Sequence, residues 1–178
     1  MANKEAIQQI VEQWARERPD LDTSGFEVVG RILVLSDHLR RRVGDALAPL
    51  GLGLWGFDVL ATLRRQGPPF RLTPTELSQA TMLTSGAMTN RLDRLEEAGL
   101  VRRDRNPDDR RGVLVVLTGA GHELVDRAVA VRFQEAAAAV APLTAQERET
   151  TAALLGKLLA SLELESSERP APRGREAP

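Results

Sequence analysis

The sequence predicts a mainly α-helical protein built around a winged helix-turn-helix, and three consecutive features lead to that fold class. A short helix is expected near residues 74–81, and a second helix is expected at 85–98 after a turn. Two β-prone pieces follow, on either side of a charged connection at 104–112. This order of elements is that of a winged helix-turn-helix. We expect the helices towards both termini to serve dimerisation, with one extra helix at the N-terminus.

The composition limits the classes of protein to which the chain can belong. With 178 residues, 42% of them apolar, the chain is long enough for one domain with a hydrophobic core. It has no cysteine, which excludes disulfides and thiolate metal sites, and its two histidines, His38 and His122, lie far apart. No apolar run approaches the ~18 residues of a membrane span, and the N-terminus lacks the pattern of a signal peptide. We therefore expect a cytoplasmic protein that needs no metal and no enzymatic cofactor.

The charge balance argues against a nonspecific nucleic-acid-coating protein, and the motifs argue against an enzyme. A net charge of −1 does not suit a protein that coats nucleic acid nonspecifically, although it is compatible with a local DNA-binding surface. The sequence shows no nucleophile–base pair, phosphate-binding loop or metal cluster. We therefore do not expect an enzyme.

Two helices are predicted before the winged lobe. The first, at residues 4–17, has an apolar stripe formed by Ile7, Ile10, Val11 and Trp14. A capping box at Ser24–Glu27 is expected to open a long helix, which Pro49 and Gly51 close. The stripe of this second helix comprises Phe26, Val29, Ile32, Leu33, Leu39, Val43 and Leu47. We assign 1–22 to the extra N-terminal helix and its linker, and 23–53 to a dimerisation helix.

Residues 54–118 form the predicted winged lobe. It begins with a core helix that ends at Arg65. The capping box Thr73–Glu76, with proline at the first helical position, opens the short helix, and Gly99 stops the next one. Strands are expected at 100–103 and 113–117, joined by turn-forming residues.

Residues 119–163 are predicted to form two more dimerisation helices. The first runs to about Val140, and a capping box at Thr144–Glu147 opens the second. Its wide apolar stripe consists of Leu154, Leu155, Leu158, Leu159 and Leu162. This stripe and the long helix from Ser24 together have more apolar surface than one small lobe can cover, so we expect a homodimer. The polar segment 164–178 is expected to be a disordered tail.

The helix at 85–98 has two faces of opposite character. The apolar arc, which must face the core, comprises Ala87, Met88, Leu92 and Leu95. The opposite arc carries donors and acceptors that suit base edges and phosphates. The candidate DNA-binding residues of this helix are Ser85, Thr89, Asn90 and Arg94. The alternative is an ordinary solvated helix face, but the capped helix before it and the hairpin after it favour DNA reading.

Arg110 and Arg111 lie at the tip of the predicted hairpin. An arginine at such a tip suits the negative potential of a narrow minor groove, so both are further candidates for DNA binding. Asp109 lies two residues before Arg111 and is expected to orient it through a charge-assisted hydrogen bond. The alternative is a solvated turn.

Arg91 is an anomaly, because it falls inside the apolar arc of its helix, between Met88 and Leu95. A buried arginine needs a partner, and Asp58 is a candidate because it lies within an apolar run. One interpretation is a structural ion pair that fixes the helix to the lobe. The other is a ligand pocket whose occupancy moves the helix. Spacing alone favours the structural pair.

The chain resembles the multiple-antibiotic-resistance regulator (MarR) family from about residue 26 to 162. The most specific part is the hairpin Asp109–Thr118, which fits the family pattern D-x-R-x-x-x-V-x-L-T, and Thr89–Leu95 and Gly99–Val101 fit around it. The resemblance implies a mainly helical dimer with two winged lobes. It also implies a repressor that releases double-stranded DNA when a small molecule binds. Because a dimer has two-fold symmetry, we expect its operator to be pseudo-palindromic.

The extra helix, the segment Trp55–Leu60 and the segment Met82–Arg91 resemble a narrower, urate-responsive, PecS-like branch of that family. The resemblance implies a set of ligand-binding residues, namely Trp14, Asp58, Arg91 and Arg103. Urate is a planar anion, so the tryptophan would stack on it and Arg103 would pair with its charge. The alternatives are another aromatic anion such as a phenolic acid, no ligand at all, or a module that engages only protein partners.

Overall fold

The computed structural model describes residues 2–81, 85–107, 109 and 112–168. Over these ranges the chain is mainly helical, with one small antiparallel sheet, as the sequence predicts. It divides into two compact units, Met1–Ala136 and Ala137–Pro178. Among the described residues no single helix has the length and apolarity to span a membrane. The segments Ser24–Leu50 and Leu54–Arg65 reach that length and apolarity only when they are taken together, and they are bent by 78° relative to each other.

Helix α1 (Ala2–Glu17) packs against α2 (Ser24–Leu47). The buried Ile7 rests on Gly30, where an added Cβ would lie 3.5 Å from the Ile7 Cγ2 atom. This is an ordinary van der Waals distance, so Ile7 packs directly over residue 30 of α2. The helices thus pack through Ile7 of α1 rather than through its exposed tryptophan, Trp14.

The predicted capping box at the start of α2 is wrong. Thr23 occupies the cap position without a side-chain hydrogen bond, and the Ser24 N–H donates to Asp22 Oδ1 at 2.9 Å. Glu27 forms an ion pair one turn ahead, with Arg31 Nη1 at 2.6 Å. In a capping box the Ser24 N–H would donate to Glu27, but here it donates to the carboxylate of Asp22. Glu27 is therefore available to pair with Arg31, four residues further along the helix.

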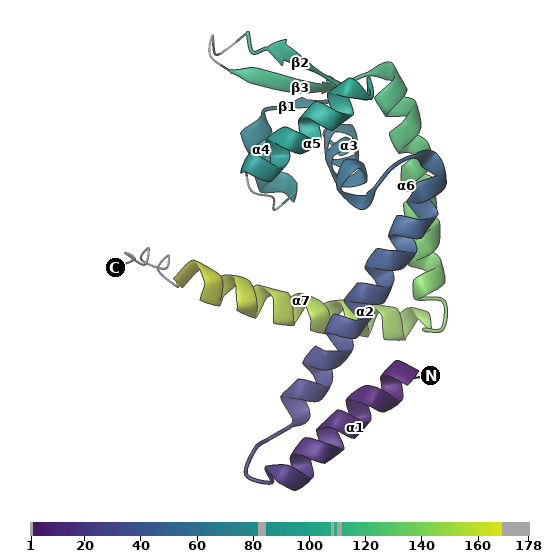
Figure 1. The fold of residues 1–178 in the computed structure, drawn as a ribbon, viewed down its shortest axis with the longest axis vertical. Coiled ribbons are helices and arrows are strands. Elements are labelled where there is room, and N and C mark those ends of the chain that lie inside the picture. The colour runs from purple at the N-terminus through teal and green to yellow at the C-terminus, as the bar shows by residue number, and fades with distance from the viewer. Residues whose placement is uncertain (1, 82–84, 108, 110–111, 169–178) are drawn as a thin grey trace. The chain divides into compact units, whose positions relative to one another are not determined.

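The core of the first unit forms where the end of α2 meets α3 (Leu54–Arg65). A short 3₁₀ turn (η1, Ala48–Leu50) and Gly51, which has a φ of +65°, turn the chain between the two helices. The fully buried side chains at this centre include Leu47, Val59, Leu60, Leu63, Leu77, Val115, Val125 and Ala128. In Figure 1 the three strands lie together on one side of α3, α4 and α5.

The helix-turn-helix pair consists of α4 (Pro74–Thr81) and α5 (Ser85–Glu97). The capping box at Thr73–Glu76 is confirmed: the Thr73 N–H donates to Glu76 Oε2 at 2.7 Å, and the Glu76 N–H donates to Thr73 Oγ1 at 3.2 Å. The backbone and hydroxyl donors of Thr73 hold the pKa of Glu76 below its usual value. Gly99, with a φ of +69°, ends the second helix as predicted.

The sheet has the order β1-β3-β2, with both pairs antiparallel. Strands β2 (Val101–Arg105) and β3 (Val113–Leu117) form the predicted hairpin, although β2 runs two residues further than expected because it pairs along the whole of β3. Strand β1 (Arg71–Leu72) was not predicted. Two residues are too short for a periodic signal, and β1 exists only through its pairing with Val115 and Val116.

Helix α6 (Gly119–Ala139) begins in direct contact with the hairpin. Thr118 Oγ1 donates to the main-chain oxygens of Gly99 at 2.7 Å and Leu100 at 3.0 Å, and accepts from the Gly121 N–H at 3.0 Å. A Cβ added to Gly121 would lie 2.0 Å from the Leu100 oxygen. The first turn of α6 therefore fits against the hairpin only because residue 121 has no side chain.

The second unit contains α7 (Ala145–Glu168), opened by the predicted capping box at Thr144–Glu147. The Thr144 N–H donates to Glu147 Oε2 at 2.8 Å, and the Glu147 N–H donates back to Thr144 Oγ1 at 3.3 Å. The prediction that disorder begins at residue 164 is wrong, because the helix continues through Glu168. Leucine and glutamate favour the helix and carry it past the end of the apolar stripe. Residues 169–178 lie outside the described part.

Replacing Gly121 by alanine is expected to lower the free energy of unfolding by about 2–3 kcal/mol, because the new methyl group would meet the backbone of Leu100. Gly119 is the matched control. It lies in the same turn and has nothing within 4 Å of its Cβ position, so Gly119→Ala should change stability by less than about 0.5 kcal/mol. Urea-induced unfolding measures both. Equal effects of the two substitutions would contradict this account of the junction.

Candidate nucleic-acid interface and effector site

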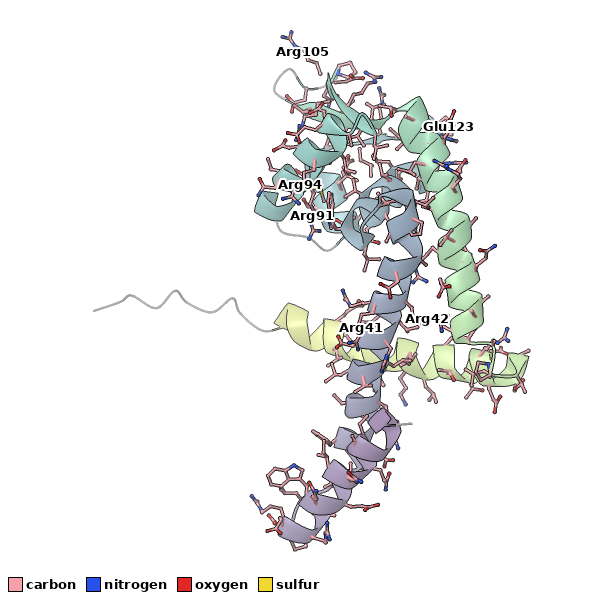
Figure 2. The ribbon with its side chains drawn as sticks, turned by 45° about the vertical axis from the view of Figure 1, so that its right-hand side comes forward. Arg41, Arg42, Arg91, Arg94, Arg105 and Glu123 are labelled. Atoms are coloured by element: carbon pink, nitrogen blue, oxygen red, sulfur yellow. The ribbon has the colours of Figure 1, made fainter. Side chains whose placement is uncertain are left out.

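Helix α5 buries one face and exposes the other, as predicted. Met88, Leu92 and Leu95 are buried in the core of the lobe. Thr89, Asn90 and Arg94 are exposed, and Figure 2 shows Arg94 on this helix with Arg91 below it. Ser85 is the first residue of α5, and its side chain lies outside the description. The exposed face thus presents amide, hydroxyl and guanidinium groups together, which is the chemistry that base edges and phosphates require.

The tip of the hairpin is described only in part. The Asn106 N–H donates to the Gly112 oxygen at 3.0 Å, and the Gly112 N–H donates to the Asp109 oxygen at 2.9 Å. These bonds close the loop and hold Asp109 at its end. Arg110 and Arg111 lie outside the described residues. The roles assigned to them, and the orientation of Arg111 by Asp109, stay predictions.

Arg103 of β2 is bound to α5. Its Nη2 donates to Asp93 Oδ1 at 2.6 Å, its Nη1 donates to Glu96 Oε2, and its main-chain N–H donates to Glu96 Oε1 at 2.8 Å. Partial burial lowers the pKa of Arg103, but the bonds to the two carboxylates outweigh this effect and raise it. We call Arg103, Asp93 and Glu96 the Arg103 clamp. It ties β2, the first strand of the hairpin or wing, to α5, the recognition helix of the helix-turn-helix, and the charge expected to pair with a ligand already has two protein partners.

Arg91 is half-buried rather than buried, and it contacts Trp55 besides acting electrostatically on the predicted partner, Asp58. Its guanidinium carbon lies 5.9 Å from the centre of the Trp55 ring, within the range of a cation–π contact. The ion pairs found among the described residues do not include one between Arg91 and Asp58. Tertiary packing brings the indole of Trp55, on α3, against this guanidinium. Trp55 therefore links the recognition helix to α3.

Asp58 lies on α3 at a small cavity. Burial of its carboxyl group raises the pKa of Asp58, although Arg132, Arg40, Arg91 and Arg65 all act to lower it. The residue as a whole is exposed, so the cause is local screening of the carboxyl group from water. The cavity, of about 280 Å³, is lined by Phe57, Asp58, Ala61, Thr62, Arg65, Ala80 and Thr81. We call it the α3–α4 cavity.

The four predicted ligand residues do not converge within one chain. Trp14 is 53% exposed on α1. None of the hydrogen bonds, ion pairs and ring contacts of the described residues joins it to Asp58, Arg91 or Arg103. Asp58 and Arg91 do act on each other electrostatically. Their assignment to a ligand stays a prediction.

Sequence reasoning missed the other arginines around Asp58. Arg65 follows Asp58 by seven residues on the same helix, so helical spacing puts both on one face and could have revealed it. Arg40 belongs to α2 and Arg132 to α6. No local signal connects residues so far apart in the sequence.

Comparison with known proteins shows the family of the chain. A family model described as the MarR family matches residues 50–112. The HTH-type transcriptional regulator PecS of Dickeya dadantii is 36% identical over 158 residues, which cover 89% of this chain and 95% of that protein. The chain belongs to the MarR family. The multiple antibiotic resistance protein MarR of Escherichia coli (strain K12) is 34% identical over 74% of this chain and 90% of its own length.

Solved structures of MarR-family proteins agree with this membership. A mutant of E. coli MarR complexed with operator DNA matches with a TM-score of 0.67 and 31% identity, covering 82% of this chain and 97% of that one. AbsC from Streptomyces coelicolor matches with a TM-score of 0.73 at 23% identity, over 80% of this chain and 97% of that chain, and supports the fold alone. The winged helix-turn-helix of the MarR type is thus confirmed. As a member of this family the chain is a DNA-binding transcriptional regulator.

Arg103→Ala is expected to lower the free energy of unfolding by about 1–2 kcal/mol, because two carboxylates lose a charge-assisted partner at a partly exposed site. Arg105 of the same strand is the matched control. It is exposed and projects away from the lobe (Figure 2), so Arg105→Ala should change stability by less than about 0.5 kcal/mol. Chemical denaturation measures both. An Arg103 variant as stable as the Arg105 variant would show that the clamp contributes nothing.

Proposed function

We propose that the chain is a homodimeric repressor that binds a pseudo-palindromic operator and releases it when urate binds. The observation that carries the proposal is the construction of α5. Asn90 and Arg94 stand on its exposed side, while Arg91, on the same helix, lies on Trp55 of the lobe. A change at Trp55 or Asp58 therefore acts directly on the helix that would read DNA.

The repressor role draws support from relatives. The chain is 38% identical, over 67% of its length, to an HTH-type transcriptional repressor of Mycobacterium tuberculosis (strain ATCC 25618 / H37Rv). An operator-bound structure is known for MarR of E. coli. An α-helix fits the major groove, where a guanidinium reads guanine and an amide reads adenine. Arg94 and Asn90 have the chemistry for both contacts.

A homodimer would cover two exposed apolar faces. On α2 the exposed large apolar residues are Phe26, Val28, Val29, Leu33, Leu35 and Leu39. On α7 they are Leu154, Leu155, Leu158, Leu159, Leu162 and Leu164. Large apolar side chains exposed in such number along two helices favour a protein interface. Sedimentation that returned only monomer at micromolar concentration would contradict the dimer.

Arg94→Ala is expected to weaken operator binding by about 1–3 kcal/mol, because a base or phosphate contact is lost. Arg127→Ala, an exposed arginine of α6, removes the same charge elsewhere and should change affinity by less than threefold. Fluorescence anisotropy with the DNA upstream of the protein's own gene measures both variants. If they bind that DNA equally well, α5 is not the reading helix.

The urate response is proposed from the resemblance to the PecS-like branch and from the electrostatics around Asp58. A planar anion near Asp58 and Arg91 would compete with Trp55 for the guanidinium and displace α5 from its DNA-binding position. Arg103 would have to exchange one of its carboxylates for the ligand, and Trp14 would have to approach from α1. A phenolic acid in place of urate, or no ligand, is the alternative.

Urate is expected to lower operator affinity, and by linkage operator DNA should lower urate affinity by the same factor. A tenfold loss corresponds to about 1.4 kcal/mol of coupling. Trp14→Ala should weaken urate binding through lost stacking while operator affinity stays unchanged, and Trp14→Phe should retain most of the response. Anisotropy and titration calorimetry measure the two affinities. Operator binding that is unaffected by urate would remove the urate assignment and favour the alternatives.

A further inference from the structure

We propose that Arg64 and Asp126 are positioning residues, which hold the winged lobe at one angle to α6 and α2 and so restrict the protein to operators with a single half-site spacing. The inference rests on the proposed homodimer and adds the residues that set its spacing. It comes from three features of the described residues: a strained residue at the edge of the lobe, ion pairs on two sides of α6, and the short attachment of α2 to the lobe.

Phe70, the residue before β1, has a strained backbone with a φ of +55°. Residues that carry a side chain rarely adopt this left-handed conformation, and it persists only where surrounding contacts hold it. The Phe70 N–H donates to the Gly67 oxygen at 2.8 Å, and the Phe70 oxygen accepts from the Leu117 N–H at 3.1 Å. These two bonds fix the backbone so that the phenyl ring contacts the end of α3 and the start of α6.

Four side chains join α3 to α6 around this ring. The guanidinium carbon of Arg64 lies 5.3 Å from the ring centre, and the imidazole of His122 meets the ring edge-on, with 5.1 Å between the two centres. Arg64 Nε donates to Asp126 Oδ1 at 2.8 Å, and His122 Nδ1 lies 3.4 Å from Asp126 Oδ2. The hydrogen bond from Arg64 holds the pKa of Asp126 below its usual value. We call Arg64, Phe70, His122 and Asp126 the Phe70 cluster.

A second ion pair holds α6 from its opposite side. Arg42 of α2, labelled in Figure 2, donates from Nε at 3.1 Å and from Nη2 at 2.9 Å to Glu135 Oε2. Glu135 follows Asp126 on α6, and at 3.6 residues per turn the two carboxylates lie about half a turn apart around the helix and roughly 13.5 Å apart along it. Each pair is partly exposed and contributes little to stability by itself. Rotation of α6 about its axis, however, would break one pair or the other.

Helix α2 enters the core of the lobe only near its C-terminal end. Its buried residues are Val43 and Leu47, whereas the exposed apolar face proposed for dimerisation lies at residues 26–39. A lobe held at that end alone would be free to pivot about it. The Phe70 cluster and the Arg42–Glu135 pair form a second connection, which runs from α3 through α6 to α2 and blocks the pivot.

A fixed lobe limits the DNA that a dimer can bind. A two-fold dimer meets half-sites about one helical turn apart, roughly 10 base pairs. One base pair more or less turns a half-site by roughly 35° about the DNA axis and moves it by about 3.4 Å along that axis. The lobe can follow only by pivoting on α2, and this movement requires the Phe70 cluster to open. The cluster therefore decides whether an altered spacing is tolerated.

The test selects bound sequences from random duplex DNA and then measures affinities by fluorescence anisotropy. Wild type should select paired half-sites with one spacing and bind the selected site at least tenfold more tightly than versions with one base pair added or removed. Arg64→Gln and Asp126→Asn should select the same half-site sequence but bind the three DNAs within threefold of one another. Arg64→Lys, which keeps the charge, should retain most of the discrimination.

Arg127→Ala is the matched control for the selection. Arg127 is exposed and follows Asp126 directly on α6, so its removal should leave the discrimination between spacings at the wild-type level. A purely structural role for the Arg64–Asp126 pair would weaken binding to all three DNAs by the same factor and leave the ratio of their affinities unchanged. That result would overturn the inference.

The outcomes also separate this inference from the proposed homodimer. If wild type selects paired half-sites but accepts all three spacings alike, the inference is overturned and the dimeric repressor stands. If wild type selects only single half-sites, both the inference and the proposed dimer fail.

Discussion

The junction around the backbone of Leu100 is the constraint on which the winged lobe depends. The Leu100 N–H donates to the Leu95 oxygen at 2.9 Å, and the Leu100 oxygen accepts from Thr118. Gly121 packs against the same oxygen from the first turn of α6. One peptide segment therefore joins the end of α5, the start of the wing and the start of α6. Any larger residue at 121 would force these three elements apart.

The Arg103 clamp adds to this junction from the side of the wing. The junction fixes the C-terminal end of α5, and the clamp ties two of its carboxylates to β2. Towards the middle of the helix, Arg91 rests on Trp55 of α3. The recognition helix is thus attached to the lobe by main-chain bonds, by an ion-pair cluster and by a cation–π contact. The first two are formed by several hydrogen bonds, whereas the third is a single contact beside Asp58.

Most of the elements could be predicted because their signals are local. The capping boxes at Thr73 and Thr144 were correct, since threonine and the glutamate three residues later bond to each other wherever the backbone turns into a helix. The box at Ser24 failed although its pattern is the same, because Asp22 supplies an acceptor nearby. Strand β1 could not be found, since its two residues depend on β3 for their hydrogen bonds. Helix α7 runs further than the sequence predicts, because polar residues do not by themselves end a helix.

The sequence by itself determined the order of the helices, the apolar arc of α5, the hairpin and the family to which the chain belongs. These properties depend on neighbours within about four residues and on motif spacing. Only the tertiary structure decided the partners of the long charged side chains: Arg103 with Asp93 and Glu96, Arg91 with Trp55, and Arg65 with the end of α4. An arginine can reach several elements from one backbone position, and the partner that it meets depends on which helices and strands pack around it. Helical spacing restricts the face on which such a residue lies, but packing between distant segments determines what it binds.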